Sequence, residues 1–175
     1  MLSDLVFMER KKLFSHADVV LYHPGHFPEL NLLIRDLYRD EGFEKIMIPS
    51  IHNVFLDANE HDFHKKILLE YGIPHFKINP ILGEQNTARD VVRNAMAGIT
   101  PQDQTVLLAG KAFFCRRFQL MAAVDAHPNL VMDVFPMEDG RSINRTNWYE
   151  SEQGTKRVLN EVRQYASIIE NLGRK

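Results

Sequence analysis

The sequence predicts a doubly wound α/β fold, a Rossmann-like three-layer sandwich with a five-stranded, mainly parallel sheet. Two observations predict it. Five short apolar runs have the composition of strands that are buried on both faces. Segments with apolar residues at helical spacing separate these runs, and such alternation implies right-handed crossovers between parallel strands. The length of 175 residues suits one domain that spans residues 1–175.

The first half of the chain alternates three apolar runs with two helical patterns. Strands are expected at 17–23 (ADVVLYH), 45–50 (KIMIPS) and 75–79 (HFKIN). After the first strand, apolar residues recur every three or four positions until Gly42, and glycine commonly ends a helix. The segment 57–72 has acids early, lysines later and a terminal glycine, in agreement with a helix dipole.

The second half continues the same alternation. A helix is expected to begin at Asn86 or Thr87, because both are favourable N-cap residues. We then expect a strand at 105–110 (TVLLAG), a helix at 112–126 and another strand at 130–136 (LVMDVFP). A last long helix follows a polar connection, and Asn147 with Glu150 three residues later resembles its capping box.

The composition argues against several classes of protein. Lysine and arginine number 21 and aspartate and glutamate 23, for a net charge of −2. Since nucleic-acid-binding proteins commonly carry a basic excess, we expect no nucleic-acid partner. The single cysteine, Cys115, excludes an internal disulfide and fits a reducing compartment. No stretch approaches the roughly 20 apolar residues of a membrane span and the start lacks a signal-like apolar core, so we expect a cytoplasmic protein.

The segment GKAFFCRR, which follows the fourth strand, is the first candidate for binding. Ligands of doubly wound sheets bind beyond the carboxyl ends of the strands, where the strand order reverses. Gly110 and Lys111 are expected at that edge. Arg116 and Arg117 differ by ~100° around a helix, so at most one of them faces the crevice. Lysine and arginine suit phosphate or carboxylate, whereas solvated surface charges are the alternative interpretation.

The segment EQNTARD supplies a second candidate at the start of a helix. Free backbone N–H groups near Asn86 and Thr87 would attract an anion. N-capping alone also explains these residues, and the two roles can coexist.

The segment YHPGHF places His23 and His26 on either side of a Pro24–Gly25 turn after the first strand. Glycine there lets a ligand approach the backbone closely. His52 follows the second strand and can converge with these two histidines, each a possible general base. A zinc site is the alternative, but the spacing and the lack of cysteine or carboxylate partners argue against it, so we expect no metal.

Other motifs argue against specific chemistries. No dinucleotide-binding glycine fingerprint, Walker A sequence or G-x-S-x-G elbow is present. Glu60, His61 and His64 have a weak metal-binding spacing and are expected on a solvated helix face. Cys115 is expected to be inert packing rather than a nucleophile.

Most of the chain, from about Ala17 to the last helix, resembles the YdcF-like family, a domain of largely unknown function that includes the envelope proteins SanA and ElyC. The resemblance is carried by ADVVLYHPG, LYRDEGFEKIMIPS, Asn86-Thr87, VLLAGKAFFCRRFQLMA and INRTNWYESEQGTKRVLNEV. Arg117 falls on the family's arginine after the fourth strand. This chain departs from the family in having Lys111 and Phe114 where many members have a serine and a histidine.

The resemblance implies two classes of ligand: S-adenosylmethionine, which a member is reported to bind, and phosphorylated envelope precursors. The main hypothesis is the binding of a small anionic or nucleotide-like ligand. The expected contacts are Pro24, Gly25, His26, Asn86, Thr87, Gly110, Lys111 and Arg117. The alternatives are an enzyme acting on a phosphorylated or nucleotide substrate with His23, His26 or His52 as general base, and a protein-interaction module.

Overall fold

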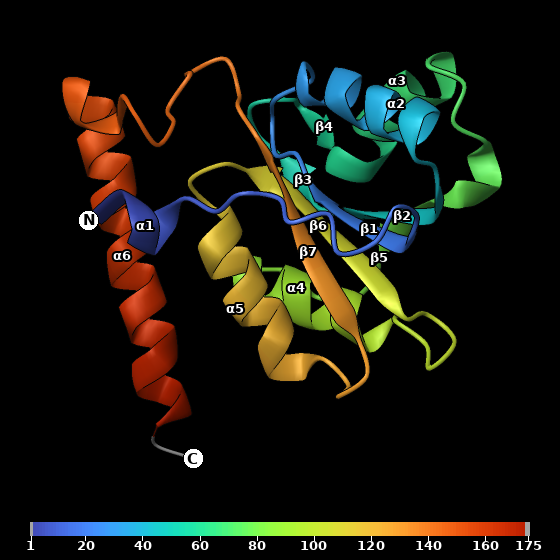
Figure 1. Ribbon diagram of the computed structural model, residues 1–175. Helices are drawn as coiled ribbons and strands as arrows, with labels where there is room; N and C mark the ends of the chain where they lie inside the picture. The colour runs from blue at the N-terminus through green and yellow to red at the C-terminus, as the bar shows by residue number, and fades with distance from the viewer. Residues whose placement is uncertain (1, 174–175) are drawn as a thin grey trace.

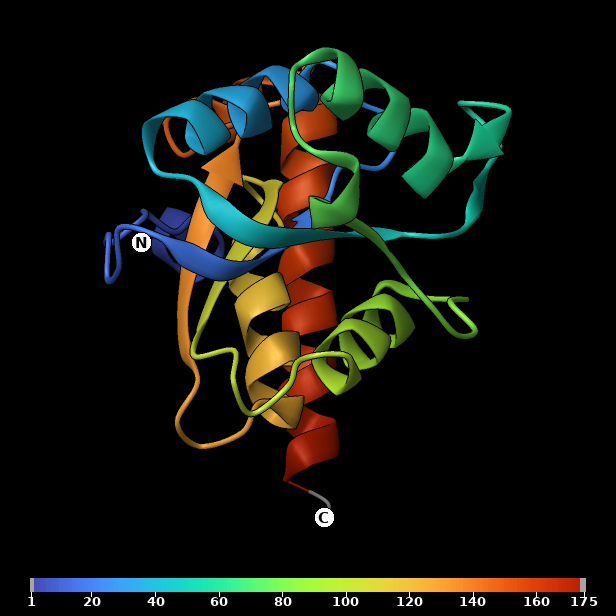
Figure 2. The same ribbon diagram turned by 90° about the vertical axis from the view of Figure 1, so that its right-hand side faces the viewer.

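The computed structural model describes residues 2–173 and is a three-layer α/β sandwich (Figures 1 and 2). Five parallel strands form its sheet in the order β5-β2-β1-β6-β7. Their bounds are β1 Ala17–His23, β2 Phe43–Pro49, β5 Ile78–Ile81, β6 Thr105–Lys111 and β7 Val131–Met137. The predicted Rossmann-like fold class is therefore confirmed.

Helices cover both faces of this sheet (Figure 2). One face carries α2 (Leu30–Asp40) and α3 (Glu60–Glu70), and the other carries α4 (Ala88–Ala97), α5 (Cys115–Asp125), α6 (Glu152–Leu172) and the short α1 (Leu2–Val6). Side chains of a strand alternate between faces. Accordingly Val19 and Leu21 of β1 join the core under α4 and α5, whereas Val20 and Tyr22 join the core under α2 and α3.

The strand order reverses between β1 and β6. From β1 the chain builds outward to β2 and β5, and it then returns to place β6 on the other side of β1, followed by β7. In the β1–β6 register, His23 lies opposite Gly110. The carboxyl ends of these two strands are therefore the point where a ligand is expected in such a sheet.

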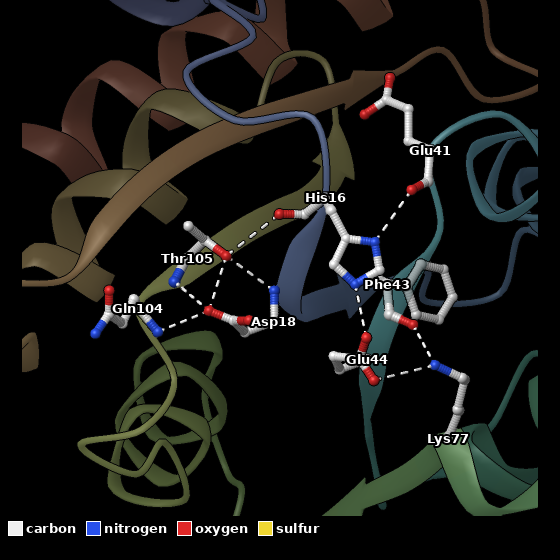
Figure 3. A network of polar contacts seen from close by, with 8 residues as sticks. All are labelled: His16, Asp18, Glu41, Phe43, Glu44, Lys77, Gln104 and Thr105. Carbon is white, nitrogen blue, oxygen red and sulfur yellow. Dashed lines mark hydrogen bonds and ion pairs between the residues drawn. The ribbon is translucent and has the colours of Figure 1, made fainter.

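A polar network at the amino ends of the strands fixes this register (Figure 3). The Asp18 carboxylate accepts hydrogen bonds from the backbone N–H groups of Gln104 (2.7 Å) and Thr105 (2.9 Å) and from the Thr105 hydroxyl (3.0 Å). On the other side of β1, the His16 ring contacts the Glu44 carboxylate at 2.8 Å. These contacts tie β1 to both of its neighbours at the edge opposite the switch point.

The start of α6 differs from the expected capping box. Asn147 and Glu150 flank a 3₁₀ turn, and Ser151 is the N-cap, with its hydroxyl accepting from the Gly154 N–H at 3.0 Å. The prediction at Asn147 was wrong because Gly154 packs against the backbone of Trp148, where an added Cβ would lie 2.2 Å from the carbonyl oxygen. That close approach separates the turn from the helix.

The segment between β2 and α3 contains a small antiparallel sheet that the apolar pattern did not predict. It consists of β3 (His52–Asn53) and β4 (Ala58–Asn59). Among residues 2–173, no helix has both the length and the apolar composition needed to cross a membrane.

Candidate functional site

A pocket of about 190 Å³ lies at the carboxyl ends of β1 and β6. Its lining comes from the turn after β1, the first residue of α4, the segment joining β6 to α5, the connection after β7, and α6. The charged side chains that line it are Lys111, Arg117, Arg141, Arg157 and Glu161. Segments distant in the sequence therefore bring four cations and one carboxylate to the switch point.

Lys111 is the last residue of β6, and within residues 2–173 its ammonium group contacts an aromatic ring but forms no ion pair. Its Nζ lies 5.1 Å from the centre of the Phe27 ring. Within residues 2–173 it makes no hydrogen bond and no ion pair. Burial, helped by the nearby charge of Arg141, lowers the pKa of Lys111 to about 8. The charges of Glu60 and Asp139 act in the opposite direction, but neither carboxylate forms an ion pair with the ammonium. A largely desolvated ammonium that no carboxylate contacts has the chemistry needed to bind an anion.

Gly25 lets the lysine pass close to the turn. Gly25 has a φ of +62°, and a Cβ at this position would lie 2.8 Å from the Lys111 Nζ. Glycine is therefore favoured by the left-handed backbone, and a larger residue would displace the Lys111 ammonium from its position.

The substitution Gly25→Ala is expected to move the Lys111 ammonium and to strain the turn. The left-handed conformation costs about 1 kcal/mol for alanine, so the free energy of unfolding should fall by roughly that amount. The free energy of anion binding should decrease by more than the free energy of unfolding does. Calorimetric titration measures the first quantity, and urea denaturation measures the second. Gly72→Ala is the matched control, because Gly72 has a φ of +87° and open space around its Cα. Equal losses of affinity in both variants would contradict this role of Gly25.

A buried hydrogen-bond chain holds the Gly25 turn in place. The Tyr22 hydroxyl donates to Asn31 Oδ1 (3.1 Å), and Asn31 Nδ2 donates to His64 Nδ1 (2.9 Å). His64 Nε2 then donates to the Gly25 carbonyl (2.8 Å). Burial lowers the pKa of His64 to about 4, so the ring is neutral at pH 7 and carries its proton on Nε2. His64 therefore supports the turn that Lys111 passes.

The expectation of a solvated face for Glu60, His61 and His64 was wrong. All three side chains are buried, because the first turn of α3 packs beneath the loops that follow β1 and β2. One Glu60 oxygen accepts from Asn53 Nδ2 at 2.6 Å, while burial raises the pKa of the Glu60 carboxyl.

Arg117 lines the pocket and Arg116 does not, as the helical spacing predicted. Arg117 donates two hydrogen bonds to Glu161 of α6, at 2.6 and 3.1 Å, and its guanidinium lies 4.7 Å from the centre of the Phe114 ring. Arg116 instead donates to the backbone oxygen of Asp4. The ion pair fixes the orientation of Arg117 and joins α5 to α6 at the pocket.

Arg141 and Arg157 belong to the site, and the sequence pattern did not identify them. Arg141 pairs with the buried carboxylate of Asp139, and its guanidinium lies 4.5 Å from the Phe27 ring centre. Arg157 lies 5.5 Å from the ring centre of Phe113. They sit in a polar connection and on a long helix, and only the tertiary packing brings these segments back to the switch point.

The three candidate histidines have different positions. His23 lines the pocket with a buried, unpartnered Nδ1, and burial, with the neighbouring lysine, lowers its pKa to about 3. His26 also lines the pocket, between Phe27 (ring centres 4.2 Å apart) and Phe55 (4.5 Å), and burial lowers its pKa. His52 is exposed on β3 and is not among the pocket residues. In the described part of the chain, no group of three or more His, Cys, Asp or Glu side chains is placed to hold a metal ion.

The start of α4 reaches the pocket through Ala88, and Thr87 is its N-cap. The Thr87 N–H donates to the Asp90 carboxylate at 3.0 Å, and the Asp90 N–H donates back to the Thr87 hydroxyl at 3.2 Å. The exposed Asn86 side chain donates to Glu84 at 2.7 Å. The predicted capping is confirmed, but these donors are engaged within the chain. The positive charge of the pocket therefore comes from side chains rather than from this helix terminus.

Gly110 allows two aromatic rings to pack against the end of β6. A Cβ there would lie 3.1 Å from Phe118 and 3.3 Å from Phe114. The neighbouring Cys115 is fully buried, with Sγ 3.5 Å from the Gly110 oxygen. Burial raises the pKa of this thiol to about 12, so the group stays protonated and unreactive at neutral pH.

The site thus combines a lysine that forms no ion pair within residues 2–173, three oriented arginines and a turn whose Gly25 carbonyl accepts a hydrogen bond from the neutral ring of His64. Arg117 and Arg141 each carry their own carboxylate, whereas Lys111 and Arg157 form no ion pair within residues 2–173. Comparisons of the chain with protein-family models, with curated proteins and with solved structures gave no match.

Proposed function

We propose that this protein binds a small anionic ligand, a phosphate- or carboxylate-bearing molecule of the nucleotide-like kind, at the carboxyl ends of β1 and β6. The observation that carries the proposal is the Lys111 ammonium, which is largely buried and has no hydrogen bond or ion pair within residues 2–173. Keeping an ammonium desolvated without a counter-ion is costly for a fold. An anionic ligand compensates that cost when it binds.

Charge and volume support this ligand class. The four cations of the pocket outnumber the carboxylates beside them, which are Glu161, Asp139 and Glu60. The volume of about 190 Å³ lies below the ~300 Å³ at which pockets enclose drug-sized ligands. The anionic group therefore fits inside, and the rest of the ligand extends from the mouth.

An exposed aromatic ring at the mouth suits a nucleotide-like remainder. Phe55 stacks on His26 and is 76% exposed. A flat apolar face beside an anion pocket favours a ligand that has an aromatic ring, such as a nucleobase, attached to its anionic group.

The pKa of His23 argues against proton transfer by this histidine. A general base works best when its pKa lies near the operating pH, and the pKa of His23 is about 3. The experiment that follows also includes S-adenosylmethionine, the candidate ligand that the resemblance to the YdcF-like family implies.

Calorimetric titration with orthophosphate, sulfate, adenosine monophosphate and S-adenosylmethionine tests the proposal. We expect the phosphate-bearing compounds to bind, with adenosine monophosphate tighter than orthophosphate because its base reaches Phe55. Binding of S-adenosylmethionine alone, which carries a carboxylate beside its cationic sulfonium, would identify a carboxylate-bearing nucleoside as the ligand class. Absence of binding by every compound at millimolar concentration would overturn the proposal.

Sulfate affinity is expected to fall as the pH rises above 8. The pKa of Lys111 is about 8, so the ammonium is mostly protonated at pH 7 and mostly neutral at pH 9. Affinity should decrease by up to about tenfold per pH unit above that pKa. Sulfate keeps its charge over this range, so titrations at pH 7, 8 and 9 report the protein alone. The variant Lys111→Arg is the control, because arginine stays charged and should flatten the profile; an unchanged profile would show that another group titrates.

A further inference from the structure

A second and larger hollow, of about 460 Å³, lies along one side of α6. Five residues of this helix line it: Gln153, Lys156, Arg157, Asn160 and Arg163. Arg157 also lines the pocket at the switch point. The two hollows therefore share one lining residue, whose guanidinium lies 5.5 Å from the ring centre of Phe113.

The helical spacing places these five side chains on one side of α6. At ~100° per residue they occupy an arc of about 120°, beside the face that buries Val158 and Glu161. Between Lys156 and Arg163 the helix rises roughly 10 Å. The stripe therefore continues away from the Lys111 pocket rather than surrounding it.

The stripe carries positive charge that the chain does not neutralise. Of the residues that the structure describes, no aspartate or glutamate lines this hollow. Within residues 2–173, Lys156, Arg157 and Arg163 form no ion pair. The side-chain amide of Asn160 adds hydrogen-bond donors between Arg157 and Arg163, and that of Gln153 adds donors before Lys156. Three cations with amide donors beside them suit a ligand with several oxyanions in a row.

We propose that the ligand of this protein carries a chain of two or more linked phosphate groups, which runs from Lys111 past Arg157 and along α6 to Arg163. This inference rests on the proposed function, since Lys111 binds the innermost phosphate. The cations are few and confined to one helix side, and the protein has a net charge of −2. These features fit a short oligophosphate, such as that of a nucleoside di- or triphosphate, rather than a nucleic-acid strand.

The test compares metal-free orthophosphate, pyrophosphate and tripolyphosphate in calorimetric titrations of the full chain. We expect tripolyphosphate to bind at least about tenfold more tightly than orthophosphate. Lys156→Gln and Arg163→Gln should each weaken tripolyphosphate by roughly threefold to fivefold, a typical loss for one partly exposed charged contact, and leave orthophosphate unchanged. Arg39→Gln removes the same charge from the exposed end of α2, on the side of the sheet away from the switch point. It should change the affinity for neither orthophosphate nor tripolyphosphate.

The outcomes separate the two proposals. If orthophosphate binds and the α6 variants bind tripolyphosphate as the unmodified protein does, the oligophosphate inference is wrong and the proposed function stands. An effect of Arg39→Gln equal to that of the α6 variants also overturns the inference, because the loss is then one of net charge. If no phosphate compound binds, the inference fails; if sulfate and S-adenosylmethionine do not bind either, the proposed function fails with it.

Discussion

Replacing Lys111 with methionine is expected to weaken anion binding strongly and, at the same time, to stabilise the unliganded protein. Methionine keeps the apolar stem of the side chain and removes the ammonium. Lys111 ends β6 at the switch point and lines the pocket. Without its ammonium, the affinity for phosphate or sulfate should fall by about 100-fold, which is the range of a strong charge-assisted contact.

The gain in stability has a separate physical cause. Folding lowers the pKa of Lys111 from 10.5 to about 8, so the charged form is disfavoured in the folded state at pH 7. Removing it should raise the free energy of unfolding by about 1–3 kcal/mol, measured by urea denaturation without ligand. Loss of binding together with a gain in stability is typical of a residue retained for function.

Arg39→Gln is again the control and should change neither quantity. A Lys111→Met variant that binds sulfate as well as the unmodified protein would remove Lys111 from the site. A variant that is destabilised by more than 1 kcal/mol would contradict the view that its charge is unpaired.

His64→Ala is expected to cause the largest loss of stability among the substitutions considered. The change leaves a cavity at a fully buried position, removes the partner of the Gly25 carbonyl and removes one of the two acceptors of Asn31 Nδ2, which keeps its hydrogen bond to the Pro28 carbonyl. A cavity of this size and the lost hydrogen bonds together cost about 3–5 kcal/mol. The free energy of unfolding from urea denaturation measures it.

His75→Ala is the matched control, because His75 is exposed in the turn before β5 and should contribute less than 0.5 kcal/mol. A loss for His64→Ala that does not exceed the loss for His75→Ala would show that the Tyr22–Asn31–His64 chain does not support the Gly25 turn.

The central sheet could be predicted from the sequence because its strands are buried on both faces and read as continuous apolar runs. The run Ala17–His23 coincides with β1. The prediction for the edge strand β5 began too early in the sequence. The segment 75–79 was predicted as a strand, but it begins with a 3₁₀ turn and the strand starts at Ile78. The β3–β4 hairpin is too short and too polar to leave an apolar pattern.

The site was predictable only where topology alone positions it. Lys111 follows β6 and His23 ends β1, so the parallel order of these strands places them together. Arg141 and Arg157 follow β7 and reach the pocket through the path of a polar connection and the packing of α6, which no local pattern encodes. His64 looked like a solvated residue because its partners, Asn31 and the Gly25 carbonyl, lie far away in the sequence.

Crystals of the protein soaked in tungstate would locate the anion site directly through anomalous scattering. We expect a tungstate ion in the pocket at the ends of β1 and β6, with an oxygen within hydrogen-bond distance of the Lys111 Nζ and another facing Arg141 or Arg157. Tungstate bound only elsewhere on the surface, with the Lys111 pocket empty at the same concentration, would contradict the account.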